Sequence, residues 1–195
     1  ALNNARDRAK AIDCMSRVKQ LRQLISTYEM EYDDMFMPST STYPSGTSVW
    51  GKLLIDNNYI DSKTDFFECP ARNITRTKVN PAQLDKYDFG TNRSTHHIIN
   101  TVNAAQNQSQ LKSNWLRYPS ATMSLCDTTS GYSNYTGIYW PKFRHNKDSS
   151  LNAGFFDGHA ASVSLLELNQ SRDTGQAPFW SIYSSNITIR RKYWK

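Results

Sequence analysis

A histidine followed by an Asp-Gly-His tripeptide is the part of this sequence whose residue types are best suited to chemistry. His145 is separated from Asp157, Gly158 and His159 by the intervening residues 146–156. Imidazole and carboxylate groups can orient a nucleophile or hold a metal ion. His145, Asp157 and His159 would therefore form the active set of a hydrolase if they converged on a serine, a cysteine or a metal.

The rest of the sequence favours a structural role for these residues. It contains no Gly-x-Ser-x-Gly elbow, no His-Glu-x-x-His helix and no glycine-rich nucleotide-binding motif. An aspartate in a tight turn bonds to nearby backbone N–H groups, so Asp157 needs no catalytic explanation. His145 would then bridge its own loop to the turn. We therefore expect that the chain is not an enzyme.

The three cysteines are a second group with chemistry of their own. Cys14, Cys69 and Cys126 lack CxxC spacing, which argues against a zinc cluster. In an oxidising compartment one pair would form a disulfide and leave one thiol, and the sequence does not select the pair. Three unpaired, buried cysteines are equally compatible with the sequence.

The Asp157-Gly158 dipeptide is also a strong signal for a β-hairpin, because strand-like runs flank it on both sides. A type I′ turn would place both residues at positive φ. Phe155 and Phe156 precede the turn and should point to opposite faces of the sheet. One of them would enter the core, and the other would meet a neighbouring segment.

A long amphipathic helix is expected at the start of the chain. Apolar residues recur there at steps of three and four, and neither Gly nor Pro interrupts the run before Pro38. The pattern predicts a continuous helix from about residue 2 to about residue 36 with one apolar stripe. The stripe comprises Leu2, Ala5, Ala9, Ile12, Met15, Val18, Leu21, Ile25, Tyr28 and Tyr32. Ala1 and Leu2 offer no N-capping side chain, which indicates that a longer helix was cut here.

Shorter elements are expected between the helix and the hairpin. Residues 48–55 contain Trp50 and Leu54 on one side and predict a short helix. Strands are predicted near residues 87–90, 97–99 and 120–126. Ile187–Ile189 would add a further strand.

Several of these features together resemble the prepilin-type family of type IV pilin-like and type II secretion pseudopilin-like proteins. In the helix, the likeness is carried by Ala1–Lys10, Cys14–Leu21 and Tyr28–Asp34. It continues in the Trp50 helix and the Cys69-Pro70 element, and in His145 followed by Asp157-Gly158-His159. The spacer after His145 is slightly longer than the usual family spacing, which would lengthen the loop 146–150.

The resemblance implies an α+β, pilin-like fold. Residues 1–36 would be the truncated pilin helix, packed on an antiparallel β-sheet within a globular head of residues 37–195, and the two parts would form a single domain. The implied function is that of a structural subunit in a type IV pilus-like or type II secretion pseudopilus assembly. An apolar segment upstream would anchor the protein in the bacterial inner membrane after processing by prepilin peptidase, with the soluble domain periplasmic or extracellular.

The resemblance also implies partners, and it leaves calcium open as a ligand without implying a cofactor. The partners would be other pilin or pseudopilin subunits, packed against the helix face of Leu2, Ala5, Ala9 and Ile12. Some pseudopilins bind calcium through carboxylates and carbonyls of a C-terminal loop. Candidate calcium donors here are Asp127, Asp148 and Asp157, although no dense acidic loop contains them. No other cofactor is expected.

Composition is compatible with this assignment and leaves one rival open. A hydrophobic content of 38% in 195 residues is enough for a core. The net charge is +6, but no basic stripe is interleaved with aromatic residues, so nucleic acid is not an expected partner. The rival is a secreted or surface module that binds glycans or proteins through exposed Trp and Tyr near residues 132–140 or 179–194.

Overall fold

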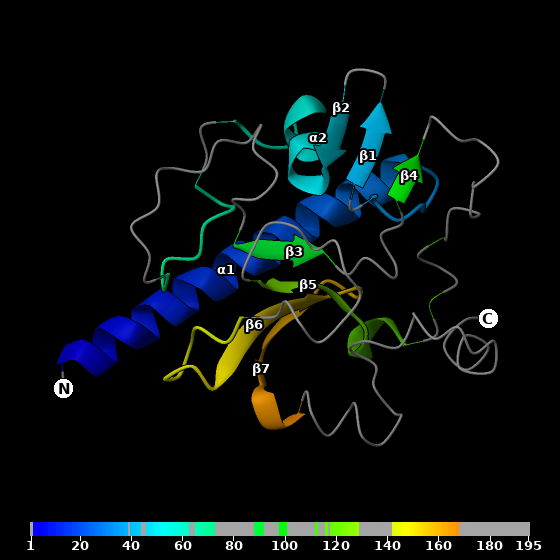
Figure 1. Cartoon of the computed structure of the whole chain (residues 1–195). Coiled ribbons are helices and arrows are strands. Elements are labelled where there is room, and N and C mark those ends of the chain that lie inside the picture. Colours follow the sequence, from blue (N-terminus) through cyan, green and yellow to red (C-terminus); the bar gives the residue numbers. More distant parts are fainter. Residues whose placement is uncertain are drawn as a thin grey trace.

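A long N-terminal helix and two small β-sheets make up most of the chain that the computed structural model describes (Figure 1). The described residues are 2–38, 40–43, 46–62, 65–72, 88–91, 98–100, 112, 116, 118–128 and 142–167. Helix α1 (Leu2–Glu31) runs along one side of both sheets, and its N-terminal end extends past them. The α+β class is therefore confirmed.

The larger sheet has four antiparallel strands in the order β3-β5-β6-β7. Its strands are β3 (Phe89–Thr91), β5 (Met123–Asp127), β6 (Ser150–Phe155) and β7 (Ala160–Ser164). A 3-10 turn, η3 (Pro119–Ala121), precedes β5. Strand β6 lies at the centre of the contact with α1, so α1 covers one face of this sheet.

The smaller sheet lies near the C-terminal end of α1 and has the order β2-β1-β4. It comprises β1 (Thr40–Tyr43), β2 (Gly46–Val49) and β4 (Ile98–Asn100), with β1 antiparallel to β2 and parallel to β4. The short helix α2 (Trp50–Asp56) follows β2 directly. The predicted helix and the three predicted central strands therefore exist within a few residues of their expected positions. The strand predicted at residues 187–189 lies outside the described residues.

Helix α1 ends at Glu31 and not at residue 36, so the predicted end is wrong. Asp33 and Asp34 adopt left-handed φ values of 58° and 60°. Aspartate tolerates this conformation because its short polar side chain can bond locally. The chain then turns back toward the sheets and buries Phe36 and Met37.

The prediction of one continuous apolar stripe on α1 is also wrong. The residues that α1 buries are Cys14, Val18, Leu21, Arg22, Ile25, Tyr28 and Glu29. Leu2 and Ile12 are 77% and 71% exposed, and Ala5 and Ala9 are exposed as well. From Ala9 to Leu21 the predicted stripe advances by steps of three residues. An α-helix has about 3.6 residues per turn, so each of these steps rotates the stripe by about 60° around the helix axis. Leu2, Ala5, Ala9 and Ile12 therefore lie on the side of α1 opposite to its core face.

The β6–β7 hairpin confirms the Asp-Gly prediction but has a different turn. Among residues 155–159 only Gly158 has positive φ, at 93°, and its N–H donates to the Phe155 carbonyl at 3.0 Å. This is a turn closed by one left-handed glycine, not the predicted type I′ turn. Phe155 and Phe156 join different hydrophobic clusters, as their alternation predicted.

Arg22 connects the buried face of α1 to this hairpin. It is 1% exposed, and its guanidinium donates to the carbonyls of Phe155 at 2.9 Å and Phe156 at 3.0 Å. The same guanidinium forms two hydrogen bonds of 2.9 and 3.0 Å with one carboxylate oxygen of Glu29. Burial raises the pKa of Glu29, while the nearby Arg22 opposes this rise.

Gly154 lies where α1 packs closely against β6. A Cβ at this position would lie 2.8 Å from Leu125 Cδ2 and 3.3 Å from Val18 Cγ1. We expect Gly154→Val to lower the free energy of unfolding by about 1–3 kcal/mol, because the side chain would force the helix and sheet apart. Chemical denaturation measures this loss.

Gly158→Asn is the matched control, because nothing lies within 4 Å of the Gly158 Cβ position and asparagine tolerates positive φ. Its free energy of unfolding should stay within about 1 kcal/mol of the parent. A Gly154→Val protein as stable as the parent would contradict the close helix–sheet approach.

Candidate functional site

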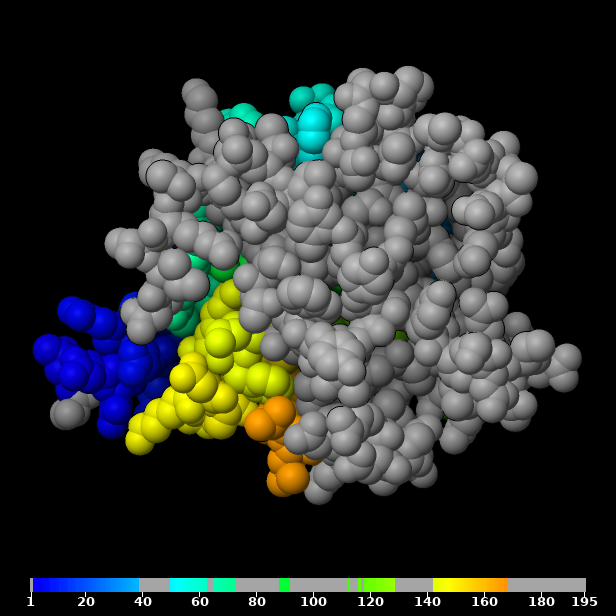
Figure 2. Space-filling view, viewed as in Figure 1, coloured from blue at the N-terminus to red at the C-terminus, as the bar shows by residue number. Residues whose placement is uncertain are grey.

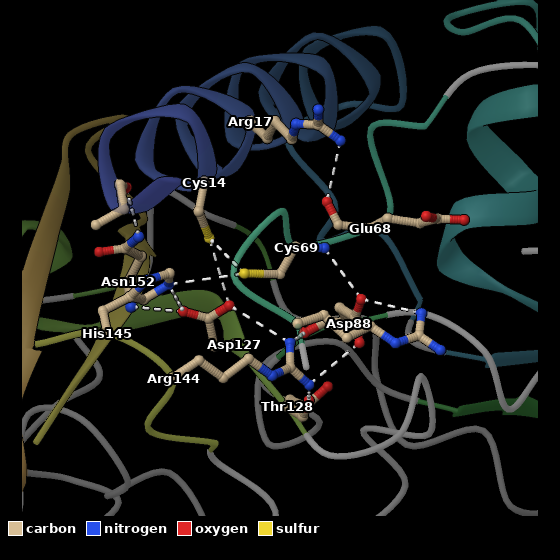
Figure 3. Close-up of polar contacts among 12 residues, drawn as sticks. Cys14, Arg17, Glu68, Cys69, Asp88, Asp127, Thr128, Arg144, His145 and Asn152 are labelled. Atoms are coloured by element: carbon tan, nitrogen blue, oxygen red, sulfur yellow. Dashed lines mark hydrogen bonds and ion pairs between the residues drawn. The ribbon is translucent and has the colours of Figure 1, made fainter. Parts of the chain in front are cut away.

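Four buried side chains converge between α1 and the four-stranded sheet: Cys14, Cys69, Asp127 and His145 (Figure 3). Each can offer one metal-ligating atom, and these atoms all lie within 4.8 Å of one another. Cys14 and Asp127 have no exposed surface, and Cys69 and His145 are only 3% and 4% exposed. We call this group the Cys-Asp-His cluster.

The contacts within the Cys-Asp-His cluster are short. The two sulfur atoms lie 3.3 Å apart, and Cys14 Sγ lies 3.5 Å from Asp127 Oδ1. His145 Nε2 lies 3.1 Å from Asp127 Oδ2 and 3.7 Å from Cys69 Sγ. One imidazole nitrogen, one carboxylate and two sulfurs therefore face a common centre.

Each member of the cluster comes from a different segment. Cys14 lies on the core face of α1, one turn before Val18. Asp127 is the last residue of β5, and His145 lies just ahead of β6, where it pairs with Ser150 in an isolated bridge. The Cys69 N–H donates to Asp88 Oδ2 at 3.0 Å, which fixes the loop that carries the thiol.

Polar groups around the cluster hold Asp127 in place. Its Oδ2 accepts a hydrogen bond of 2.8 Å from the Asn152 N–H, and the Asn152 side chain donates to the Ala11 carbonyl of α1 at 3.1 Å. Arg144 Nη1 lies 3.7 Å from Asp127 Oδ1. The carboxylate is thus oriented from the sheet and balanced by a cation.

Asp88 is the central carboxylate of a group of charged residues that surrounds the Cys-Asp-His cluster. It is 2% exposed and lies 3.3 Å from Arg72 Nη1 and 3.1 Å from Arg144 Nη2. Arg144 also donates to the Asp88 carbonyl at 3.2 Å and to the carbonyl of Thr128. These contacts join the Cys69 loop, the start of β3 and the segment ahead of β6 (Figure 3).

The cluster shifts the proton affinity of its members in opposite directions. The hydrogen bond with Cys14 and the contact with His145 lower the pKa of Cys69 to about 6, although burial opposes this shift. The hydrogen bond with Cys69 and burial raise the pKa of Cys14. Burial alone would lower the pKa of His145, but its contacts with Asp127 and Cys69 outweigh burial and raise that pKa to about 9. A thiolate at Cys69 is therefore favoured.

The geometry does not match a Cys-His-Asp catalytic triad. In a triad the nucleophile and the orienting side chain face different ring nitrogens of the histidine. Here Asp127 and Cys69 both approach Nε2 of His145, whereas its buried Nδ1 has no hydrogen-bond partner among the described residues. The arrangement is suited instead to holding a metal ion or to joining the two cysteines.

The predicted hydrolase set is not assembled, so that alternative is wrong for these residues. His145 lies ahead of β6, whereas Asp157 and His159 lie beyond its other end, and a strand of six residues spans about 20 Å. At the hairpin turn, His159 Nδ1 contacts Asp157 Oδ1 at 2.6 Å and the His159 N–H donates to the same oxygen at 3.2 Å. These two residues close the turn locally.

The predicted calcium donors are not brought together either. Asp127 is buried in the Cys-Asp-His cluster, Asp148 is exposed in the turn ahead of β6, and Asp157 lies at the far end of that strand. The predicted calcium site is therefore wrong. The aromatic residues at 132–140 and 179–194, which would form the surface of the rival binding module, lie outside the described residues.

The Cys-Asp-His cluster was not predicted from the sequence, because its residues are far apart along the chain. Cys14 and Cys69 are 55 residues apart, and Cys69 and His145 are 76 apart, so no short motif joins them. Cys126 lies in a separate hydrophobic cluster with Met123 and Leu151. All three thiols are free and buried, which matches the unpaired alternative. The position of Cys14 on the core face of a helix was the one available signal.

Two surface hollows approach the cluster. A groove of about 710 Å³ between α1 and the sheet and a smaller one of about 300 Å³ beside Arg72 are both lined by His145. Asn152 also lines the larger groove, and Arg144 lines the smaller one. His145 is the one member of the cluster that lines these two hollows.

Comparisons of the chain with protein-family models, with curated proteins and with solved structures found no match. Among the described residues, no helix is both long enough and apolar enough to cross a membrane.

Proposed function

We propose that the chain is the head domain of a structural subunit that assembles through its first helix, in a pilus-like or pseudopilus-like polymer of the bacterial envelope. The observation that carries this proposal is the division of α1 into two parts. Its C-terminal part is buried against the sheets from Cys14 onward, and residues 2–9 are exposed without interruption. Figure 2 shows the N-terminal part of α1 at the edge of the molecule on the face shown.

The exposed part of α1 carries the residues that helix packing requires. Leu2 and Ile12 lie on the side opposite to the core face, together with Ala5 and Ala9, which are one turn apart. Small residues at this spacing let two helix backbones approach closely. Large apolar residues this exposed are a common mark of a contact surface when they gather on one face. The proposed occupant of this face is the same helix of neighbouring subunits, and the membrane anchor would be an apolar segment ahead of Ala1.

Cysteine cross-linking in the full-length protein tests this proposal. We expect an Ile12→Cys variant, expressed in the native host and oxidised in the intact cell, to yield several-fold more covalent dimer than a Leu166→Cys variant. The two positions are matched in exposure, at 71% and 66%, but Leu166 belongs to the segment that follows β7 and not to α1. Cross-linking is quantified on non-reducing gels.

The proposal also requires that changes to this face leave the head intact. Ala9→Arg should change the free energy of unfolding of the isolated chain by no more than about 0.5 kcal/mol, because the residue is exposed. The same change should abolish Ile12→Cys cross-linking. Equal cross-linking at positions 12 and 166, or assembly unaffected by Ala9→Arg, would overturn the proposal.

A further inference from the structure

We propose that Cys14, Cys69, Asp127 and His145 bind one zinc ion in a tetrahedral, structural site. The inference is independent of the assembly proposed above, because it depends only on the buried interior of the head. The ion would join α1, the Cys69 loop, β5 and the segment ahead of β6 at a single point.

The distances between the candidate ligand atoms agree with those of a zinc site. Bonds of about 2.3 Å to sulfur and about 2.0–2.1 Å to nitrogen or oxygen place tetrahedral ligands about 3.3–3.8 Å apart. Four contacts among these side chains measure 3.1, 3.3, 3.5 and 3.7 Å, with Cys14 facing Oδ1 and His145 facing Oδ2 of Asp127. One ligand atom from each of the four residues lies within 4.8 Å of the others, so small side-chain adjustments would bring them to coordination distance.

The donor chemistry favours zinc over calcium and magnesium. Two thiolates with one imidazole and one carboxylate form a mixed sulfur, nitrogen and oxygen set, whereas calcium and magnesium take oxygen ligands almost exclusively. The set is nearly closed to solvent, since none of the four residues is more than 4% exposed. Full enclosure by four protein ligands is typical of structural zinc, while catalytic zinc keeps an open position.

Charge balance supports the same assignment. Two thiolates and one carboxylate would bring three negative charges into the interior, and a divalent cation leaves a single excess negative charge. Arg144, 3.7 Å from Asp127 and 9% exposed at its side chain, compensates that charge.

The surrounding hydrogen bonds resemble those that orient ligands around bound metals. The Asn152 N–H and Arg144 hold the two oxygens of Asp127, and Asp88 holds the backbone N–H of Cys69. The Nδ1 of His145 is buried and lacks a partner among the described residues, and His145 lines both surface hollows. A histidine that ligates through Nε2 leaves Nδ1 as a donor, so this atom needs only one water molecule.

The competing outcome is a disulfide between Cys14 and Cys69, whose sulfurs already lie 3.3 Å apart. Its formation would require an oxidant to remove two electrons and two protons from the thiols. Bound zinc would hold both sulfurs as thiolates and protect them from that reaction. The two outcomes are mutually exclusive and chemically distinguishable.

Metal analysis of the whole 195-residue chain tests the inference. The protein is purified under reducing conditions, incubated with zinc chloride, freed of unbound metal by gel filtration and analysed by plasma mass spectrometry. We expect about one zinc ion per chain. The Cys69→Ser and His145→Ala variants should lose stoichiometric binding, whereas Cys126→Ala, which removes the third buried cysteine, should retain it.

Cobalt substitution keeps the test decisive if a ligand variant fails to fold. The parent protein loaded with Co²⁺ should show thiolate-to-cobalt charge-transfer bands and the intense visible bands of tetrahedral coordination. Absence of stoichiometric zinc and of these bands in the parent protein would overturn the inference. Equal zinc binding by Cys69→Ser and Cys126→Ala would also overturn the inference, because it would mean an adventitious ion only. A Cys14–Cys69 disulfide, found by peptide mass analysis of protein isolated without reductant, would overturn it as well.

Discussion

We expect Arg22→Leu to lower the free energy of unfolding by about 3–5 kcal/mol, because removal of one member of a buried ion pair leaves the other charge without compensation. Glu29 is 2% exposed, and Arg22 is the cation that contacts it at 2.9 Å. The carbonyls of Phe155 and Phe156 would lose their guanidinium donors at the same time. Denaturant titration followed by circular dichroism measures the loss.

The dependence of this loss on pH identifies its cause. Burial already raises the pKa of Glu29 in the folded protein, and removal of Arg22 raises it further. The folded state would then bind the proton more tightly than the unfolded chain, in which glutamate titrates near about 4.3. The loss of unfolding free energy caused by Arg22→Leu should therefore be largest at neutral pH. It should become smaller as the pH falls toward the pKa of glutamate in the unfolded chain.

Two further variants separate the ion pair from the backbone contacts. Arg22→Leu combined with Glu29→Leu should recover part of the stability, since paired apolar replacements of buried ion pairs are often tolerated. Recovery should be incomplete because the carbonyls of Phe155 and Phe156 would still lose the hydrogen bonds from the Arg22 guanidinium. Arg8→Leu, at an exposed position of the same helix, should change stability by no more than about 0.5 kcal/mol. A loss for Arg22→Leu no larger than that for Arg8→Leu would contradict the described anchor.

The second large effect is expected at Asp88. Asp88→Ala should lower the free energy of unfolding by about 3–5 kcal/mol, because it leaves the guanidinium groups of Arg72 and Arg144 without their shared carboxylate. The Cys69 N–H would also lose its acceptor. If zinc occupies the Cys-Asp-His cluster, its affinity should fall about 10- to 100-fold, as is usual when a residue that orients a ligand is removed.

Asp148→Asn is the control for this experiment. Asp148 is exposed at a φ of 61°, which asparagine tolerates, so stability should change by no more than about 0.5 kcal/mol. Thermal unfolding of the two variants side by side gives the comparison. An Asp88→Ala protein within 1 kcal/mol of the parent would show that the arginine contacts do not support the fold.

The parts of the fold that follow from local signals were predictable from the sequence. The absence of Gly and Pro through residue 31 gave α1, and Asp157-Gly158 between two strand-like runs gave the β6–β7 hairpin. The end of α1 was not predictable from helix-breaking residues. Two aspartates adopt the left-handed conformation after the helix, at a position where glycine usually ends a helix. The parallel pairing of β1 with β4 joins distant segments and has no local signature.

The candidate site was much less accessible to sequence reasoning. Its ligands come from four segments, and metal motifs are recognised from short spacings that this chain lacks. His145 was predicted as a candidate site residue, but together with Asp157 and His159. Strand β6, which follows His145, places those two residues at its other end, away from the cluster. Arg22 and Glu29 were detectable in principle, since two opposite charges seven residues apart interrupt the buried helix face.

The division of α1 into a buried part and a free part has a mechanical consequence. A helix of 30 residues is about 45 Å long at about 1.5 Å per residue, so tension applied to its free end acts on the head along that axis. The side chain of Arg22 reaches sideways from the helix to the carbonyls of the β6–β7 hairpin. Tension along α1 would therefore load the hydrogen bonds between Arg22 and the hairpin simultaneously, in a shear geometry, and would not break them one after another.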